Sequence, residues 1–180
     1  MRPSTMQLFL VVLGGRLPGC HLECHDVRWV AADSLDSAIP QLKRQWIGPK
    51  KGLHLDSYCT VKVIDGHRID IGSGPSTKPE KPRLWFVNLG AYHPDELAER
   101  HRFGLVVANS KRGAAMAAKQ RWLNNLEQVH TDDLFGIDDP LGVDACLPID
   151  GQGLWHVRLT PTATAANDSG RPDWVGYRPI

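Results

Sequence analysis

The segment Leu8-Phe9-Leu10-Val11-Val12-Leu13-Gly14 has a counterpart 76 residues further along the 180-residue chain, at Leu84-Trp85-Phe86-Val87-Asn88-Leu89-Gly90. With that offset held and no gap, residues 8–56 align with residues 84–132. Fifteen of the 49 aligned pairs are identical, where average composition would give about three. A fixed offset between long similar segments indicates a duplicated structural unit. We therefore expect two tandem copies of one fold.

The two apolar segments predict short strands that are covered on both faces. A second strand is expected over 25–32 and a helix over 35–46, where apolar residues recur at spacings of three and four. Two more strands are expected over 53–56 and 61–71, with Asp65-Gly66 as a hairpin turn. Each unit should therefore run strand, strand, helix, strand, strand. We predict an α+β protein made of two tandem units related by a pseudo-twofold axis, with antiparallel sheet and helices on one face.

The same patterns predict where the units begin and end. The first unit should span 7–71 and the second 84–158, joined by a Gly/Ser/Pro-rich linker over 72–83. An acidic insertion is expected near 133–147, because sequence similarity returns after it at an offset of 85. Residues 159–180 should form a C-terminal tail.

Composition and charge exclude several classes of partner. The chain has 21 basic and 20 acidic residues, so it lacks the basic excess that binds nucleic acid. No apolar run approaches the eighteen residues needed to span a membrane. The apolar run before Cys20 is similar to a lipoprotein signal, but its counterpart deep inside the chain indicates a core strand instead. We expect a cytoplasmic protein whose four cysteines are reduced thiols.

The candidate binding residues belong to two motifs, Glu-x-His and His-x-Asp, that occur in both copies. In a strand, residues two apart share a face, so each motif can present both side chains together. Such a group could bind a divalent metal, form an acid/base pair, or line a binding groove. The duplication favours another interpretation, in which these residues hydrogen-bond across strands and fix the sheet register, a role that both copies would need to keep. The candidates are Glu23, His25, His54 and Asp56 in the first unit, and Glu99, His101, His130 and Asp132 in the second.

No recognised catalytic or cofactor motif occurs in the chain. The spacing of Cys20-His21-x-x-Cys24-His25 matches no standard zinc pattern, and the cysteines are absent from the second copy. We predict no cofactor and no resident metal. The predicted function is a non-catalytic binding or interaction module, whose partner is a protein or a second copy of the chain. The alternative is a small metal-dependent hydrolase that uses the Glu-x-His and His-x-Asp groups.

Several segments of the first copy together resemble a known bacterial family, the domain of unknown function 1543. They are Leu8–Gly14, Glu23-Cys24-His25-Asp26, Ser34-Leu35, Ile39-Pro40-Gln41, His54-Leu55-Asp56 and Val63-Ile64-Asp65-Gly66. Members of the family carry one or two copies of its unit. The second copy here departs from the pattern, with Arg102 in place of Asp26 and Met116 in place of Pro40. The resemblance implies a compact protein and brings no established activity with it.

Overall fold

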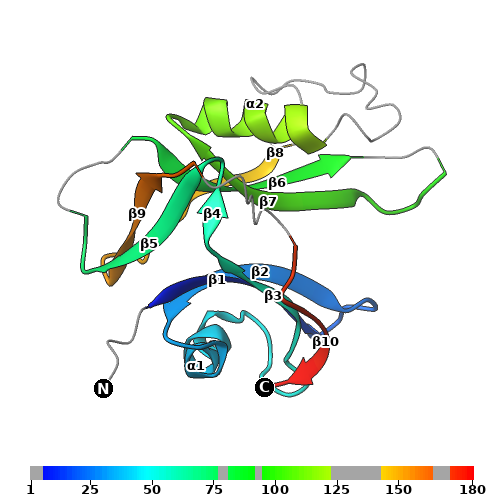
Figure 1. Ribbon diagram of the computed structural model, residues 1–180. Helices are drawn as coiled ribbons and strands as arrows, with labels where there is room; N and C mark the ends of the chain where they lie inside the picture. Colours follow the sequence, from blue (N-terminus) through cyan, green and yellow to red (C-terminus); the bar gives the residue numbers. More distant parts are fainter. Residues whose placement is uncertain (1–5, 77–80, 92–94, 123–142, 164–170) are drawn as a thin grey trace. The chain divides into compact units, whose positions relative to one another are not determined.

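The computed structural model describes residues 6–76, 81–91, 95–122, 143–163 and 171–180 (Figure 1). The chain divides into two compact units. Unit 1 consists of Met1–Thr77 together with Asp150–Ile180, and unit 2 of Lys78–Ile149. The C-terminal residues therefore belong to the same unit as the N-terminal copy. The domain boundaries expected from the sequence place them elsewhere.

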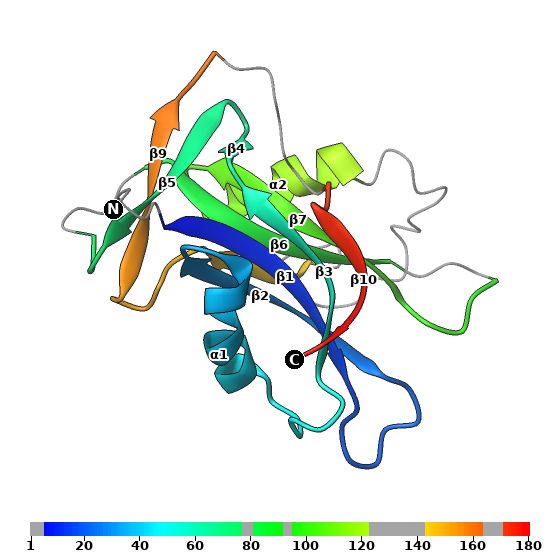
Figure 2. The same ribbon diagram turned by 60° about the horizontal axis from the view of Figure 1, so that its bottom comes forward.

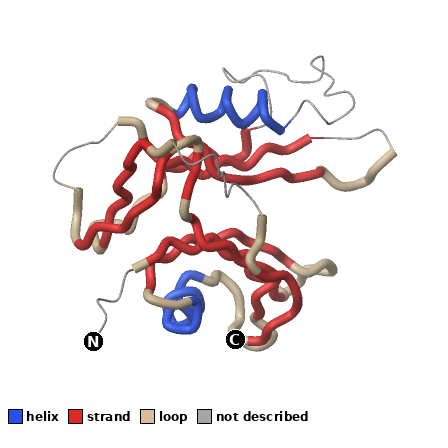
Figure 3. Tube along the Cα trace, in the orientation of Figure 1, coloured by secondary structure: helices blue, strands red, loops and turns tan. Residues whose placement is uncertain are grey.

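Unit 1 is built around a four-stranded antiparallel sheet with the strand order β10-β3-β1-β2. Helix α1 packs on one face of this sheet, as Figure 3 shows. The elements are β1 (Gln7–Gly15), β2 (Cys24–Ala32), α1 (Leu35–Gln45), β3 (His54–Val61) and β10 (Trp174–Pro179).

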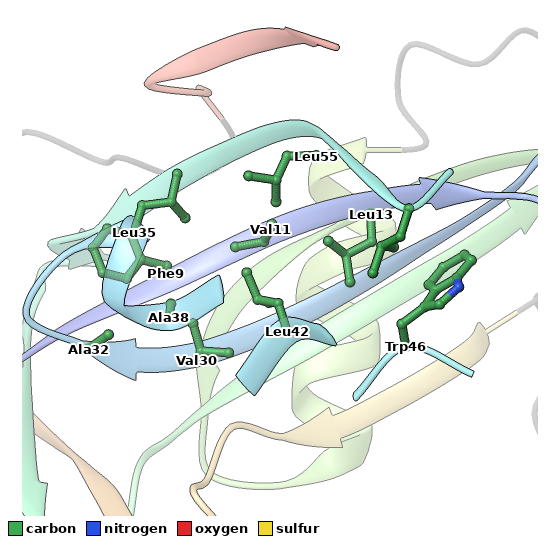
Figure 4. Packing of buried hydrophobic residues seen from close by; sticks show 11 residues of the cluster. Phe9, Val11, Leu13, Val30, Ala32, Leu35, Ala38, Leu42, Trp46 and Leu55 are labelled. Carbon is green, nitrogen blue, oxygen red and sulfur yellow. The ribbon is translucent and has the colours of Figure 1, made fainter. Parts of the chain in front are cut away.

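Helix α1 begins at a capping box that the sequence provides. The Ser34 hydroxyl accepts from the Ser37 backbone N–H at 3.2 Å, and the Ser37 hydroxyl accepts from the Ser34 N–H at 3.1 Å. The apolar side of the helix then packs on alternate residues of β1 (Figure 4). The resulting core contains Phe9, Val11, Leu13, Val30, Ala32, Leu35, Ala38, Leu42, Trp46, Leu53 and Leu55.

A second sheet of unit 1 has the order β4-β5-β9, formed by Val63–Ile64, His67–Ser73 and Trp155–Pro161. Asp65 and Gly66 join β4 to β5 with φ values of 49° and 69°. Two left-handed residues in succession match the twist of a tight hairpin. The hairpin expected from Asp65-Gly66 is therefore present.

The segment 159–180, expected as a tail, instead supplies strand residues to unit 1. It contains the end of β9, which pairs with β5, and the whole of β10, which pairs with β3 (Figure 2). Strand β10 is fixed at both ends, because Thr60 N donates to Asp173 Oδ2 at 2.8 Å and Ile180 N donates to Leu53 O at 3.1 Å. Trp174 and Ile180 also pack against the core. Apolar side chains thus hold this end of the chain in place.

Unit 2 repeats the same arrangement in a three-stranded antiparallel sheet of order β7-β6-β8. Its core combines large residues of the sheet with the alanines of the helix, which allow close packing of α2 on β6 and β7. The elements are β6 (Arg83–Ala91), β7 (Arg100–Ala108), α2 (Lys111–Trp122) and β8 (Val143–Pro148). The α+β class and the tandem repeat are therefore confirmed.

The repeat keeps its offset of 76 as far as the helix and loses it before the third strand. In unit 1 the pairs Val12↔Ser57 and Leu13↔Leu55 leave Asp56 as an extra residue, which is a β-bulge. In unit 2 the pairs Asn88↔Ala145 and Leu89↔Val143 leave Asp144 in the same position. Asp56 therefore corresponds to Asp144 rather than Asp132. Most of the insertion expected near 133–147 lies outside the described residues, and its last residues belong to β8.

Candidate functional site

Four side chains of unit 1 that the sequence singles out lie together, and we call them the His–carboxylate cluster: Glu23, His25, His54 and Asp56. Imidazoles and carboxylates alternate around a ring. The Asp56 carboxylate lies 3.2 Å from the Nε2 atom of each histidine, one oxygen to each ring. The Glu23 carboxylate completes the ring, at 3.7 Å from His54 Nε2 and 3.9 Å from His25 Nε2.

Gly14 makes room for the cluster. It pairs with His25 on one side, in β2, and with His54 on the other, in β3. A Cβ at this position would lie 2.3 Å from His54 Nε2 and 2.9 Å from Asp56 Oδ2, closer than real Cβ atoms approach. The two imidazoles therefore meet because β1 has no side chain between them. In the sequence, glycine at both Gly14 and Gly90 already indicated a position that cannot hold a side chain.

Asp56 is the extra residue of the β-bulge in β3, beside Leu13. Residues two apart in a strand share a face, which places Asp56 on the same side as His54. Bulges are frequent beside functional sites. The Asp56 carboxylate lies 3.2 Å from the Nε2 atoms of both histidines.

His54 is the buried member of the cluster, with only 1% of its surface exposed. Its Nδ1 atom lies 2.9 Å from Gly52 O, and because a carbonyl only accepts, Nδ1 carries the proton of that hydrogen bond. The neutral ring then presents a lone pair from Nε2 toward Asp56 and Glu23. The Nε2 lone pair and the carboxylate oxygens are all hydrogen-bond acceptors, so none of them can donate to another. The arrangement is balanced only by a proton on Nε2, by a bound cation, or by a ligand that donates hydrogen bonds.

The Asp56 carboxylate also lacks a hydrogen-bond donor. Its Oδ2 atom is buried and accepts no hydrogen bond from any described residue, although His25 Nε2 lies 3.2 Å away. The distance alone is within reach, but the ring is not aligned for a hydrogen bond, so we take Oδ2 as unsatisfied. The side chains of His25 and Glu23 are 54% and 38% exposed. The cluster is therefore open to solvent on their side.

Tyr177 covers the buried histidine. Its ring centroid lies 4.2 Å from that of His54, with an interplanar angle of 36°. Strand β10 brings it there from the far end of the chain, and Arg178 Nη2 donates to Asp36 Oδ1 at 2.5 Å to help hold that strand. The sequence does not connect Tyr177 with His54, because no local pattern relates the last strand to β3.

Unit 2 keeps one half of the cluster. His101 pairs with Gly90, and its Nε2 atom lies 3.8 Å from Glu99 Oε2. The expected second half, His130 and Asp132, lies outside the described residues. By the pairing of β8, Leu55 corresponds to Val143 and Asp56 to Asp144.

Neither a metal site nor a membrane-spanning helix is found among the described residues. Within the described parts of the chain, no three or more His, Cys, Asp or Glu side chains are arranged to hold a metal ion. No described helix is long and apolar enough to cross a bilayer. Among the described residues, His54 is the buried histidine, and it lies beside two carboxylates, Asp56 and Glu23.

The chain is a duplicated small α+β domain that carries the Glu-x-His motif in both copies. The family model described as Domain of Unknown Function (DUF1543) matches residues 20–71 and 96–147, once in each copy. The chain belongs to this family, which confirms the resemblance noted from the sequence. It is also similar to the protein Il1583 from Idiomarina loihiensis, known from a crystal structure, with 33% identity, 97% of each chain covered and a TM-score of 0.72. No curated protein matches the chain.

Proposed function

We propose that the protein is a non-catalytic binding module, and that the His–carboxylate cluster of unit 1 binds the positively charged, hydrogen-bond-donating group of an organic ammonium ligand. One observation carries the proposal. The buried His54 uses Nδ1 for Gly52 O and directs Nε2 toward two carboxylates. A donor placed among these acceptors satisfies all of them.

The charge of the site supports a cationic ligand. With neutral imidazoles the cluster carries two negative charges and no positive one. An ammonium group supplies up to three N–H donors, and charge-assisted hydrogen bonds to carboxylates are about twice as strong as neutral ones. The buried Asp56 Oδ2 is a free acceptor for one of them. Burying such an atom without a partner costs roughly 1–3 kcal/mol, which a bound donor would recover.

A metal-dependent hydrolase remains the alternative, because one observation favours it: both histidines and both carboxylates meet around one point of the sheet. Against it, the described residues contain no group arranged as metal ligands. The ammonium proposal needs no such arrangement, since it uses hydrogen bonds to the carboxylates and not metal coordination. The two proposals differ in which probe binds.

Isothermal titration of the full-length protein with ethylammonium, guanidinium and Zn²⁺ tests the proposal. We expect ethylammonium to bind with a stoichiometry of one per chain and Zn²⁺ to bind weakly. Glu23→Gln and Asp56→Asn should each weaken ethylammonium binding at least about tenfold, since a hydrogen bond to a charged group contributes roughly 1.5–3 kcal/mol. Asp70→Asn is the matched control, because its carboxylate pairs with Arg68 on β5, away from the cluster. Tight Zn²⁺ binding in place of ethylammonium would establish the alternative, and binding of neither probe would refute both.

A further inference from the structure

Tyr177 lies beside Asp56 as well as beside His54, because the pairing of β10 with β3 is irregular at this point. Strand β10 has two residues, Gly176 and Tyr177, where β3 has only Asp56. The flanking pairs are Val175↔Ser57 and Arg178↔Leu55. Asp56 is also the extra residue on its other side, toward β1. Both irregularities of the sheet therefore meet at one carboxylate of the His–carboxylate cluster, and such irregularities are frequent beside binding and active sites.

Strand β10 carries two aromatic side chains with different surroundings. Trp174 packs against the core of unit 1 and stacks on Tyr58, with ring centroids 6.4 Å apart. A Cβ on Gly176 would lie 2.8 Å from Trp174 Cζ2, so this glycine leaves room for the indole. Tyr177 instead contacts His54, and 66% of its surface remains exposed. One aromatic residue thus anchors the strand, and the other is presented to solvent beside the cluster.

We propose that the ligand of the cluster is an arylalkylammonium compound. Its ammonium group donates to Glu23 and Asp56, and its aromatic ring packs on the exposed part of the Tyr177 ring. This inference rests on the proposed function, which assigns the charged group of the ligand, and it adds the organic part.

The distances between the two groups fit a short arylalkyl chain. Asp56 Oδ1 lies 3.2 Å from His54 Nε2, and the ring centroids of His54 and Tyr177 are 4.2 Å apart. Ring bonds of about 1.3 Å place an imidazole nitrogen about 1 Å from its ring centre, so Asp56 Oδ1 lies within about 9 Å of the Tyr177 ring centre.

A two-carbon link between the ammonium and the ring spans this separation. Bond lengths of about 1.5 Å put the nitrogen of 2-phenylethylammonium about 5 Å from the centre of its ring. The hydrogen bond to the carboxylate adds about 3 Å, and aromatic rings pair at centroid distances of about 4.5–7 Å. The same molecule can therefore donate to Asp56 and contact Tyr177.

The composition of the site favours an aromatic group over a plain alkyl group. The cluster supplies polar groups alone, whereas small-molecule sites combine a few placed polar groups with apolar and aromatic surface. Tyr177 is the aromatic surface next to it. Two aromatic rings attract each other through their quadrupoles in addition to the area that they bury, and a saturated ring lacks this contribution.

Isothermal titration of the full-length protein tests the inference with ethylammonium, 2-phenylethylammonium and 2-cyclohexylethylammonium, which share the ammonium group. We expect the phenyl compound to bind about tenfold more tightly than ethylammonium and several-fold more tightly than the cyclohexyl compound. Tyr177→Phe should keep the phenyl-to-ethyl ratio, and Tyr177→Ala should reduce it below about twofold. Val175→Ala is the matched control on β10 and should leave the ratio unchanged. A ratio measured within each variant does not depend on how much of that variant is folded.

A second readout locates the ligand ring directly. Nuclear Overhauser effects are expected between the phenyl protons of the bound ligand and the ring protons of Tyr177. Equal affinities for the phenyl and ethyl compounds, or a phenyl advantage that survives Tyr177→Ala, would overturn this inference and leave the proposed function in place. A cyclohexyl compound that binds as tightly as the phenyl compound would overturn the assignment of an aromatic group. Binding of none of the three amines would refute the proposed function, and this inference with it.

Discussion

Gly14 of β1 pairs with His54 of β3, and a Cβ on Gly14 would lie 2.3 Å from the Nε2 atom of that histidine. The same relationship occurs a second time in unit 1, in the other sheet. Gly72 of β5 pairs with His156 of β9, and its Cβ would lie 2.4 Å from the imidazole. In both places a glycine in one strand provides the space for a histidine on its neighbour. Of these two histidines, only His54 has carboxylates beside it among the described residues.

This pair of glycines gives the first prediction. Gly14→Ala should displace His54 and Asp56, lower stability by about 1–3 kcal/mol through overpacking, and abolish ethylammonium binding. Gly72→Ala should lower stability by a similar amount and leave binding intact. Urea denaturation and isothermal titration measure the two effects. Loss of binding in both variants would mean that general destabilisation, and not the cluster, governs the affinity.

The histidines themselves give the second prediction. His54 Nδ1 bonds Gly52 O and His156 Nδ1 bonds Gly74 O, each at 2.9 Å. His54→Ala and His156→Ala should therefore each lose about 1 kcal/mol for the hydrogen bond, together with the contribution of the buried ring. Only His54→Ala should lose ligand binding. Thermal unfolding followed by circular dichroism gives the stability, and titration of the folded variants gives the affinity. Retention of full affinity by His54→Ala would remove His54 from the site.

The third prediction concerns Tyr177, the aromatic residue that covers His54. Tyr177→Ala should expose His54 and weaken ethylammonium binding several-fold, because the ring that lies 4.2 Å from the imidazole keeps water from it. Val175→Ala is the control on the same strand, since that side chain is 68% exposed. Hydrogen exchange at the His54 Cε1 position reports the exposure directly. Equal exchange rates in the two variants would show that Tyr177 does not protect the histidine.

The sequence predicts the local part of this structure well. Strands β1 and β2 and helix α1 follow from periodicities within a dozen residues, and the offset of 76 relates them correctly to β6, β7 and α2. The four members of the cluster in unit 1 are also named by the sequence, because two motifs recur there. Their meeting depends on Gly14, whose identity with Gly90 marks a position where no side chain fits.

The parts that could not be predicted depend on pairing between distant segments. The third strand of unit 2 is defined by its register with β6, and a gapless alignment assigns Asp132 to the position of Asp56 although the pairing places Asp144 there. Similarly, β10 has the composition of a tail, and only its pairing with β3 shows that Tyr177 reaches His54. Patterns within one segment of sequence carry no information about contacts between distant segments. The duplication in the sequence suggests a structural role for the cluster, whereas we propose a binding role.

The last prediction decides between these two roles by the sign of a stability change. If the cluster is structural, its Asp56 carboxylate stabilises an imidazolium at His54, and Asp56→Asn should destabilise the protein. If the cluster is a binding site held without its ligand, the carboxylate faces the lone pair of His54 Nε2 at 3.2 Å, and the side-chain amide of Asn can donate to that nitrogen instead.

We therefore expect Asp56→Asn to raise the free energy of unfolding by about 0.5–1.5 kcal/mol while it abolishes ethylammonium binding. The measurement is urea denaturation at neutral pH. Asp70→Asn again serves as the control and should change neither quantity, because the exposed pair with Arg68 contributes little to stability. A lower unfolding free energy for Asp56→Asn would identify the cluster as a device that holds the sheet together, since a binding residue is expected to cost stability when its ligand is absent.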